Sequence, residues 1–247
     1  MLHKAGIPRG GHVADLGCGR GFLSLDAARM VGPAGRVTAI DRSTVSLQAL
    51  EEEASSRGLE NLEAVEADIS SLPMGEAEAD AVVARSVLSY VPDRGRVLIE
   101  AIRVLKGGGT ISLFEPVLTE EELMVDWGEE SAAWLKLQLT LSSYHPAFSF
   151  KRDDLVEEVK RAGFAEVDRL TWHAGVSRPY SREEEVIEEF RTSLPGKLSL
   201  SACWLEHGVG EDEVARIARR LLEESRRPSY RDILHCIYIW SVKPGTI

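Results

Sequence analysis

Three alternating glycines follow a short apolar run near the start of the chain, and their spacing suits close contact with a ligand. Gly17, Gly19 and Gly21 let the backbone adopt positive φ angles and approach another molecule without Cβ clashes. The apolar residues from Val13 are typical of a buried strand, and a helical pattern resumes after Phe22. This order of strand, glycine turn and helix predicts a loop that presents backbone N–H groups to a ligand.

Charged and polar residues stand at the ends of the runs that we expect to be strands. In an open α/β sheet, ligands bind in the crevice outside the carboxyl ends of the strands, near the point where the strand order reverses. The residues expected to converge there are Asp15, Asp41, Asp68, Arg85, Ser86, Glu115 and Pro116. Their repeated placement at strand ends predicts one binding crevice. Asp80 stands at the start of a strand and is expected to be structural.

Strand and helix patterns alternate through the first 115 residues. Short apolar or β-branched runs indicate strands at 13–15, 35–41, 62–68, 79–85, 110–115, 165–172 and 233–242. Amphipathic spacing indicates helices at 43–57, 93–105, 152–162 and 214–222. Gly107, Gly108 and Gly109 are expected to stop the second of these helices. We therefore expect an α/β fold with a doubly wound, Rossmann-like, mostly parallel seven-stranded sheet.

The glycine loop and the acid before it resemble a known motif. Asp15-x-Gly17-x-Gly19-x-Gly21 is similar to the first motif of the class I S-adenosylmethionine-dependent methyltransferases. The resemblance covers about residues 10–115 well, and 150–172 and 233–242 more loosely. It implies S-adenosyl-L-methionine as the cofactor and methyl transfer to a small organic acceptor, at an O, N or C atom, as the activity.

The resemblance also assigns roles within the crevice. The cofactor-binding residues that it implies are Asp15, Gly17, Cys18, Gly19, Asp41, Arg42, Asp68, Ile69, Arg85 and Ser86. Asp41 would accept from the ribose hydroxyls, and Asp68 with Ile69 would contact the adenine. The backbone of the glycine loop would approach the amino-acid moiety, whose positive end Asp15 would help to hold. A sulfonium with an ammonium group tolerates such acids, whereas a pyrophosphate would be repelled.

Several other activities share this kind of sheet, and a non-catalytic subunit that binds S-adenosylmethionine remains the main alternative. A nicotinamide-dependent oxidoreductase would carry its third glycine where Phe22 stands. An aminopropyltransferase would carry an acid pair where Arg85 and Ser86 stand. DNA methyltransferases that modify amino groups carry an Asn/Asp-Pro-Pro-Tyr motif after the fourth strand, and this chain has none there.

Methyl transfer from a sulfonium is an in-line displacement, so the enzyme contributes mainly positioning and desolvation. A base is needed only where the acceptor must first lose a proton. The candidate catalytic residues are Tyr90, His145 and His173. Tyr90 stands where a histidine is frequent in the small-molecule branch of the family. Each histidine has an alternative reading as a structural or merely exposed residue.

We expect a single methyltransferase domain over 1–247 with two helical insertions. These insertions, at about 117–148 and 178–228, follow the fifth and sixth strands and would form a lid or an acceptor-binding region. Members of the family usually carry one or two closing helices before the first strand. Only about a dozen residues precede Val13 here. The lid is expected to come from the insertions, with a partial deletion at the N-terminus and a neighbouring subunit as the alternatives.

The composition of the chain limits which binding partners and which cellular compartment we expect. The net charge of −11 disfavours nucleic acid, because a phosphate backbone would be repelled. No apolar stretch is long enough to span a bilayer and no secretory segment begins the chain, so we expect a cytoplasmic protein without membrane contact. The three cysteines, Cys18, Cys203 and Cys236, are far apart. Their spacing predicts neither a metal site nor a dithiol.

Overall fold

The computed structural model describes most of the chain. The described residues are 1–120, 122–123, 126, 128–135, 150–176, 182, 184–185, 208–227, 230 and 232–245. Contacts between Cα atoms group the chain into two compact units. The first unit holds Met1–Glu115, Arg152–Thr171 and Ile237–Ile247, and the second holds Pro116–Lys151 and Trp172–Cys236. The single domain expected over 1–247 stays a prediction.

The strands form one mixed sheet in the order β3-β2-β1-β4-β5-β8-β6, with β7 paired to β8. They are β1 (His12–Leu16), β2 (Arg36–Asp41), β3 (Leu62–Glu66), β4 (Ala79–Arg85), β5 (Leu105–Pro116), β6 (Glu122–Leu123), β7 (Ala165–Val176) and β8 (Asp232–Val242). Neighbours among β1 to β5 are parallel, and β6 runs antiparallel to β8. The seven predicted strands are confirmed, and the short β6 is additional. Because β1 lies between β2 and β4, the strand order reverses at the glycine loop.

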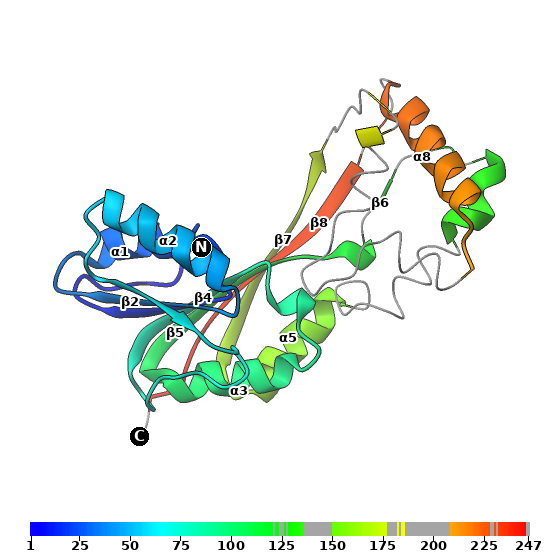
Figure 1. The fold of residues 1–247 in the computed structure, drawn as a ribbon. Coiled ribbons are helices and arrows are strands. Elements are labelled where there is room, and N and C mark those ends of the chain that lie inside the picture. The colour runs from blue at the N-terminus through cyan, green and yellow to red at the C-terminus, as the bar shows by residue number, and fades with distance from the viewer. Residues whose placement is uncertain are drawn as a thin grey trace. The chain divides into compact units, whose positions relative to one another are not determined.

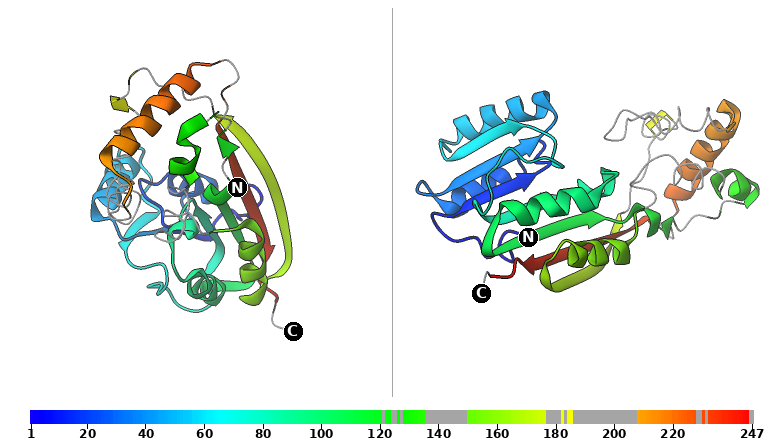
Figure 2. Two further views of the ribbon diagram at one scale, coloured as in Figure 1. Left: turned by 90° about the vertical axis from the view of Figure 1, so that its right-hand side faces the viewer. Right: turned by 90° about the horizontal axis from the view of Figure 1, so that it is seen from below.

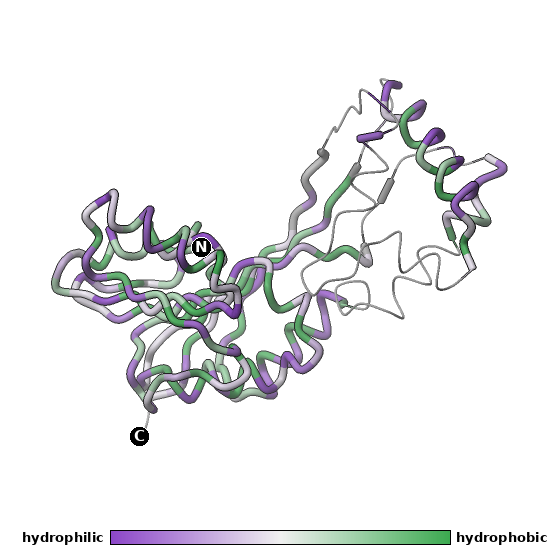
Figure 3. The backbone as a smooth tube through the Cα atoms, viewed as in Figure 1, coloured by the Kyte–Doolittle hydropathy of each residue, from purple (hydrophilic) through white to green (hydrophobic). Residues whose placement is uncertain are grey.

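Helices cover both faces of the first unit's sheet, as the doubly wound prediction requires. Figures 1 and 2 show α1 (Ser24–Val31) and α2 (Thr44–Ser56) over one face, with α3 (Arg94–Val104) and α5 (Arg152–Arg161) over the other. The buried side of α1 packs on Val13, Val37 and Val83, which come from three adjacent strands. Hydrophobic and hydrophilic residues alternate along α3 and α5 in Figure 3, the pattern of helices with one buried side.

Local sequence signals explain where these helices begin and end. Ser43 precedes α2, and its hydroxyl accepts from the Ser46 amide at 3.3 Å. Asp93 precedes α3, and its carboxylate accepts from the Arg96 amide at 2.9 Å. Both are N-caps that satisfy a free amide of the first turn. The predicted starts of both helices are therefore confirmed.

The three consecutive glycines after α3 have a different role from the predicted one. The helix ends at Val104, and Leu105 is already extended and buried as the first residue of β5. The glycines lie within the strand, where the pairing of β4 with β5 is irregular between Ala79 and Ala81. A Cβ on Gly109 would lie 2.9 Å from the Lys106 carbonyl oxygen. The prediction of a glycine stop was wrong, because the helix ends before these residues and Gly109 fits a crowded position in the irregular part of the strand.

The described part of the second unit is built around one long helix. The helix α8 (Glu211–Ser225) contacts the 3₁₀ helix η3 (Gly128–Glu130), and the Arg216 guanidinium lies 3.3 Å from the Glu130 carboxylate. It confirms the helix predicted around Val214–Leu222. Much of both predicted insertions, including 136–149 and 186–207, lies outside the described residues. In the part that the structure describes, no helix is long and apolar enough to cross a membrane.

Candidate functional site

The glycine loop is tied to the neighbouring strand by its own backbone. The amides of Gly17 and Cys18 both donate to the carbonyl oxygen of Ile40, at 2.8 and 3.0 Å. Gly17 and Gly21 have φ angles of +65° and +85°, which favour glycine. A Cβ on Gly17 would lie 2.3 Å from a Val87 methyl, so only glycine lets the segment after β4 approach the loop.

Gly19 differs from the other two glycines because space is open beside it. Its φ is +52°, and a Cβ built there would meet no atom within 4 Å. Its amide donates to Asp41 Oδ2 at 2.8 Å. The loop therefore offers an open cradle of backbone over which an extended small molecule could lie, with a carboxylate at one side.

Asp41 ends β2 at the carboxyl edge of the sheet, as predicted. The side chain is half-buried, and its second oxygen, Oδ1, accepts from the Ser43 amide at 2.9 Å. These two amide hydrogen bonds fix the orientation of the carboxylate. Each oxygen can still accept further bonds, because a carboxylate has about four lone-pair sites. Asp41 thus presents two oriented acceptor oxygens at the carboxyl edge of the sheet.

Asp15 lies beneath the loop rather than at its surface. It is only 2% exposed, and Ser24 at the start of α1 donates its hydroxyl to Asp15 Oδ2 at 2.5 Å. Burial raises the pKa of Asp15 from 3.8 to about 7, and the charge of Asp41 adds to the rise. The side chain joins β1 to α1 and supports the loop from below. Its predicted contact with the cofactor stays a prediction.

The raised pKa of Asp15 predicts a pH-dependent stability of the free protein. A carboxyl whose pKa is higher when folded binds its proton more tightly in the folded state, so stability falls as pH rises between about 4 and 7. Three pKa units correspond to at most about 4 kcal/mol. Asp15→Asn should remove most of this loss, as measured by urea unfolding at pH 5 and pH 8. Asp26→Asn, at an exposed position on α1, is the control. Parallel pH profiles for wild type and Asp15→Asn would contradict the assignment.

Asp68 and Arg42 lie at the neighbouring strand ends and interact electrostatically. The exposed Asp68 carboxylate accepts from the Ser70 amide at 2.8 Å and from its hydroxyl at 2.7 Å. These bonds lower the pKa of Asp68, and the positive charge of Arg42 lowers it further. Ile69 beside it is 8% exposed. The structure thus brings the expected adenine and ribose residues to the same edge of the sheet.

Glu115 organises the segment that follows β4, a role that the sequence did not indicate. Its carboxylate is fully buried and accepts from the amides of Val87, Leu88 and Ser89, at 3.0, 2.9 and 3.1 Å. Burial raises the pKa of Glu115, and the three amide bonds partly oppose that rise. Since Val87 also packs against Gly17, Glu115 indirectly sets the position of the glycine loop. An acid at a strand end was the only available signal.

Three predicted site residues lie next to the segment 87–89 in the sequence. Arg85 and Ser86 precede it, and Tyr90 follows it. Ser86 has a φ of +53°, and its amide donates to the Phe114 carbonyl oxygen at 2.8 Å. The Arg85 guanidinium lies 4.3 Å from the centre of the Phe22 ring. Tyr90 is half-buried, and burial together with the Glu115 charge raises the pKa of its phenol. At neutral pH Tyr90 is therefore a hydrogen-bond donor and not a base.

The other candidate catalytic residues do not belong to the first unit. His173 is exposed in the second unit, and its ring centre lies 5.8 Å from that of His235. His145 lies outside the described residues. Cys18 is buried among apolar side chains, and burial raises the pKa of its thiol, as expected of a space-filling residue. Among the described side chains, no group of three acids, histidines or cysteines could hold a metal ion.

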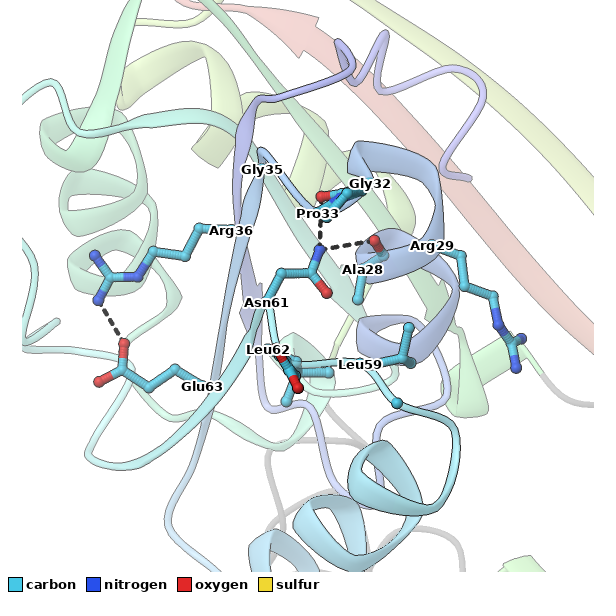
Figure 4. A pocket seen from close by; sticks show the side chains of 12 residues that line it. Ala28, Arg29, Gly32, Pro33, Gly35, Arg36, Leu59, Asn61, Leu62 and Glu63 are labelled. Carbon is cyan, nitrogen blue, oxygen red and sulfur yellow. Dashed lines mark hydrogen bonds and ion pairs between the residues drawn. The ribbon is translucent and has the colours of Figure 1, made fainter.

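A pocket of about 720 Å³ opens at the opposite edge of the sheet, where β2 and β3 begin (Figure 4). Asn61 lies within it and donates from Nδ2 to the carbonyl oxygens of Ala28 and Gly32, both at 2.9 Å. An ion pair between Arg36 and Glu63 lies at its side. The Asn61 hydrogen bonds satisfy carbonyl groups at the end of α1, and the ion pair joins residues at the starts of β2 and β3. The pocket is therefore separate from the crevice at the strand ends.

The chain is similar in sequence to known methyltransferases. Residues 7–163 match the family described as a methyltransferase domain. A demethylmenaquinone methyltransferase from Listeria monocytogenes is 28% identical over 173 residues, which cover 69% of this chain and 72% of the relative. A carboxy-S-adenosyl-L-methionine synthase from Dichelobacter nodosus is 28% identical over 137 residues, 52% of this chain and 57% of the relative. The chain thus spans little more than half the length of the second relative.

Solved structures of low sequence identity share the fold. A SAM-dependent methyltransferase from Aquifex aeolicus aligns with a TM-score of 0.56 and 16% identity, covering 98% of this chain and 86% of that one. A phosphoethanolamine N-methyltransferase from Haemonchus contortus, in complex with S-adenosyl-L-methionine, aligns with a TM-score of 0.58 and 15% identity, covering 99% and 51%. With a family match over more than half of its residues, the chain belongs to the class I S-adenosylmethionine-dependent methyltransferases.

Proposed function

We propose that this chain transfers a methyl group from S-adenosyl-L-methionine to a small organic acceptor, at an O, N or C atom. The observation that carries the proposal is the open cradle at Gly19, with the oriented Asp41 carboxylate at its side. Similarity to a demethylmenaquinone methyltransferase and to a phosphoethanolamine N-methyltransferase supports a small-molecule acceptor. The net charge of −11 argues against a nucleic-acid acceptor.

The residues at the strand ends suit the cofactor's parts and charges. Asp41 would accept from both ribose hydroxyls, and Asp68 with Ile69 would meet the adenine. The backbone from Gly17 to Gly19 would lie along the amino-acid moiety, near the backbone of Arg85 and Ser86. The cofactor supplies an activated methyl group on a positively charged sulfur, and that charge is stabilised by nearby acids.

This chain's own contribution to the reaction is positioning and the exclusion of water. Glu115 accepts hydrogen bonds from the amides of segment 87–89 and so fixes its position. Val87 of that segment packs against Gly17 of the loop, and Tyr90 directly follows the segment. Tyr90, kept protonated by its raised pKa, would orient the acceptor by donating a hydrogen bond. A base, if the acceptor must lose a proton, would come from His145 or His173. The two insertions would cover the acceptor.

Two matched glycine variants test the cofactor site. Gly19 and Gly58 both have positive φ, at +52° and +65°, and a Cβ on either meets no atom within 4 Å. Alanine should cost each site a similar backbone penalty of about 1–2 kcal/mol. Only Gly19→Ala should also weaken S-adenosylhomocysteine binding, by at least tenfold in isothermal titration, because its methyl group fills the cradle. Equal affinity in the two variants would contradict the site.

The alternative of a non-catalytic binding subunit needs a separate measurement. Transfer of a tritiated methyl group can be followed against a panel of phenols, amines and carboxylic acids at saturating cofactor. The proposed function requires transfer to at least one acceptor class, lost in Asp41→Ala. Tight binding of S-adenosylhomocysteine without any transfer would favour the binding subunit. The cytoplasmic location stays a prediction.

A further inference from the structure

Arg85 is the last residue of β4, and its side chain is held in place by aromatic rings. Its guanidinium carbon lies 4.3 Å from the centre of the Phe22 ring and 5.7 Å from that of Phe114. Arg85 and Phe114 are paired across β4 and β5. Phe22 directly follows the glycine loop and is 69% exposed. Two aromatic contacts thus fix the direction of a charged side chain at the carboxyl end of β4.

The charge of Arg85 is not neutralised within the part of the chain that the structure describes. Some other arginines there have carboxylate partners, as Arg94 has Glu158 at 2.8 Å and Arg103 has Glu100 at 2.7 Å. Arg85 is exposed, and its described contacts are the two rings. In a chain with 40 acidic residues and 29 basic ones, an oriented guanidinium without a carboxylate is open to an external anion.

The direction of the side chain separates it from the predicted cofactor contacts. Arg85 stands on the same face of the sheet as Val83, which packs against α1, whereas the backbone of Arg85 and Ser86 borders the glycine loop. Because the proposed cofactor contact of Arg85 is made by its backbone, its side chain is left for a second molecule.

We propose that Arg85, oriented by Phe22 and Phe114, binds an anionic oxygen group of the methyl acceptor, either a carboxylate or a phosphate. The inference rests on the proposed function and narrows its acceptor class. Guanidinium groups bind both anions through paired, charge-assisted hydrogen bonds. The exposed Phe22 ring adds an apolar surface beside the charge, which suits an acceptor with a flat or hydrophobic body.

The test uses the full chain saturated with S-adenosylhomocysteine and three probes of similar shape. Benzoate and phenyl phosphate carry the two candidate anions, and benzamide is the neutral control. Dissociation constants are measured by NMR titration. We expect at least one anion to bind tenfold or more tightly than benzamide, and the stronger of the two identifies the acceptor's anionic group. Arg85→Gln should abolish the preference, and Arg85→Lys should retain part of it.

Arg29→Gln is the matched control, because Arg29 is an exposed arginine near the other end of α1. It should leave the preference for the anion unchanged. Equal binding of all probes to the wild type, or failure of both anions to bind, would overturn the proposal. So would a fall of fivefold or more in S-adenosylhomocysteine affinity in Arg85→Gln, because the side chain would then belong to the cofactor. Failure of the wild type to bind S-adenosylhomocysteine would instead contradict the proposed function.

Discussion

Replacing Asp41 by alanine should lower the affinity for S-adenosylhomocysteine at least a hundredfold. The carboxylate would lose two charge-assisted bonds to ribose hydroxyls, each contributing about 1.5–3 kcal/mol. It also orients the loop, because Gly19 donates to one of its oxygens and Ser43 to the other. Isothermal titration at pH 7.5 measures the effect directly.

Two further variants serve as controls for Asp41→Ala. Asp41→Asn keeps one carbonyl acceptor and should lose less affinity than Asp41→Ala. Asp26→Ala removes an exposed acid of α1 and should bind as the wild type does. Thermal unfolding of all three shows whether the loop variant still folds. A folded Asp41→Ala that binds within threefold of the wild type would remove Asp41 from the site.

Replacing Glu115 by alanine should have the largest effect on stability. Three backbone amides would lose their acceptor inside the protein, and each unsatisfied donor costs roughly 1–3 kcal/mol. The sum is comparable with the ~5–15 kcal/mol that keeps a domain of ordinary stability folded. We expect little folded protein, judged by circular dichroism and by the free energy of urea unfolding.

Glu115→Gln removes the charge and can keep two of the three hydrogen bonds. A glutamine oxygen can still accept from Val87 and Leu88, but its NH₂ group would face the Ser89 amide. We expect a folded protein that is destabilised by about 1–3 kcal/mol. Its S-adenosylhomocysteine affinity should also fall, because the segment 87–89 supports the loop. Wild-type stability in Glu115→Ala would show that these amides find other partners.

The sequence predicts those parts of the site that depend on neighbouring residues. The spacing of Gly17, Gly19 and Gly21 predicts the turn, and the acid at the end of β2 predicts Asp41. The cofactor contact of Asp15 stays a prediction, and the structure adds that Asp15 is buried against Ser24, nine residues along the chain. That burial depends on how α1 returns over β1, and no local pattern encodes it.

Long-range packing decides the features that sequence reasoning missed. Glu115 meets amides 26 to 28 residues earlier, because the parallel register sets Arg85 beside Phe114. The stack of Arg85 on Phe22 depends on the same register and on the loop. The glycines after α3 were read as a helix stop because glycine often ends helices. Their place in β5 depends on long-range pairing, because Gly108 and Gly109 exchange backbone hydrogen bonds with Lys243.

A crystal structure of the chain with S-adenosylhomocysteine bound would test the proposed cofactor site. We expect both ribose hydroxyls within hydrogen-bonding distance of the Asp41 carboxylate, the amino-acid moiety over Gly19, and the adenine beside Asp68 and Ile69. A ligand bound elsewhere, for example in the pocket around Asn61, would contradict this site.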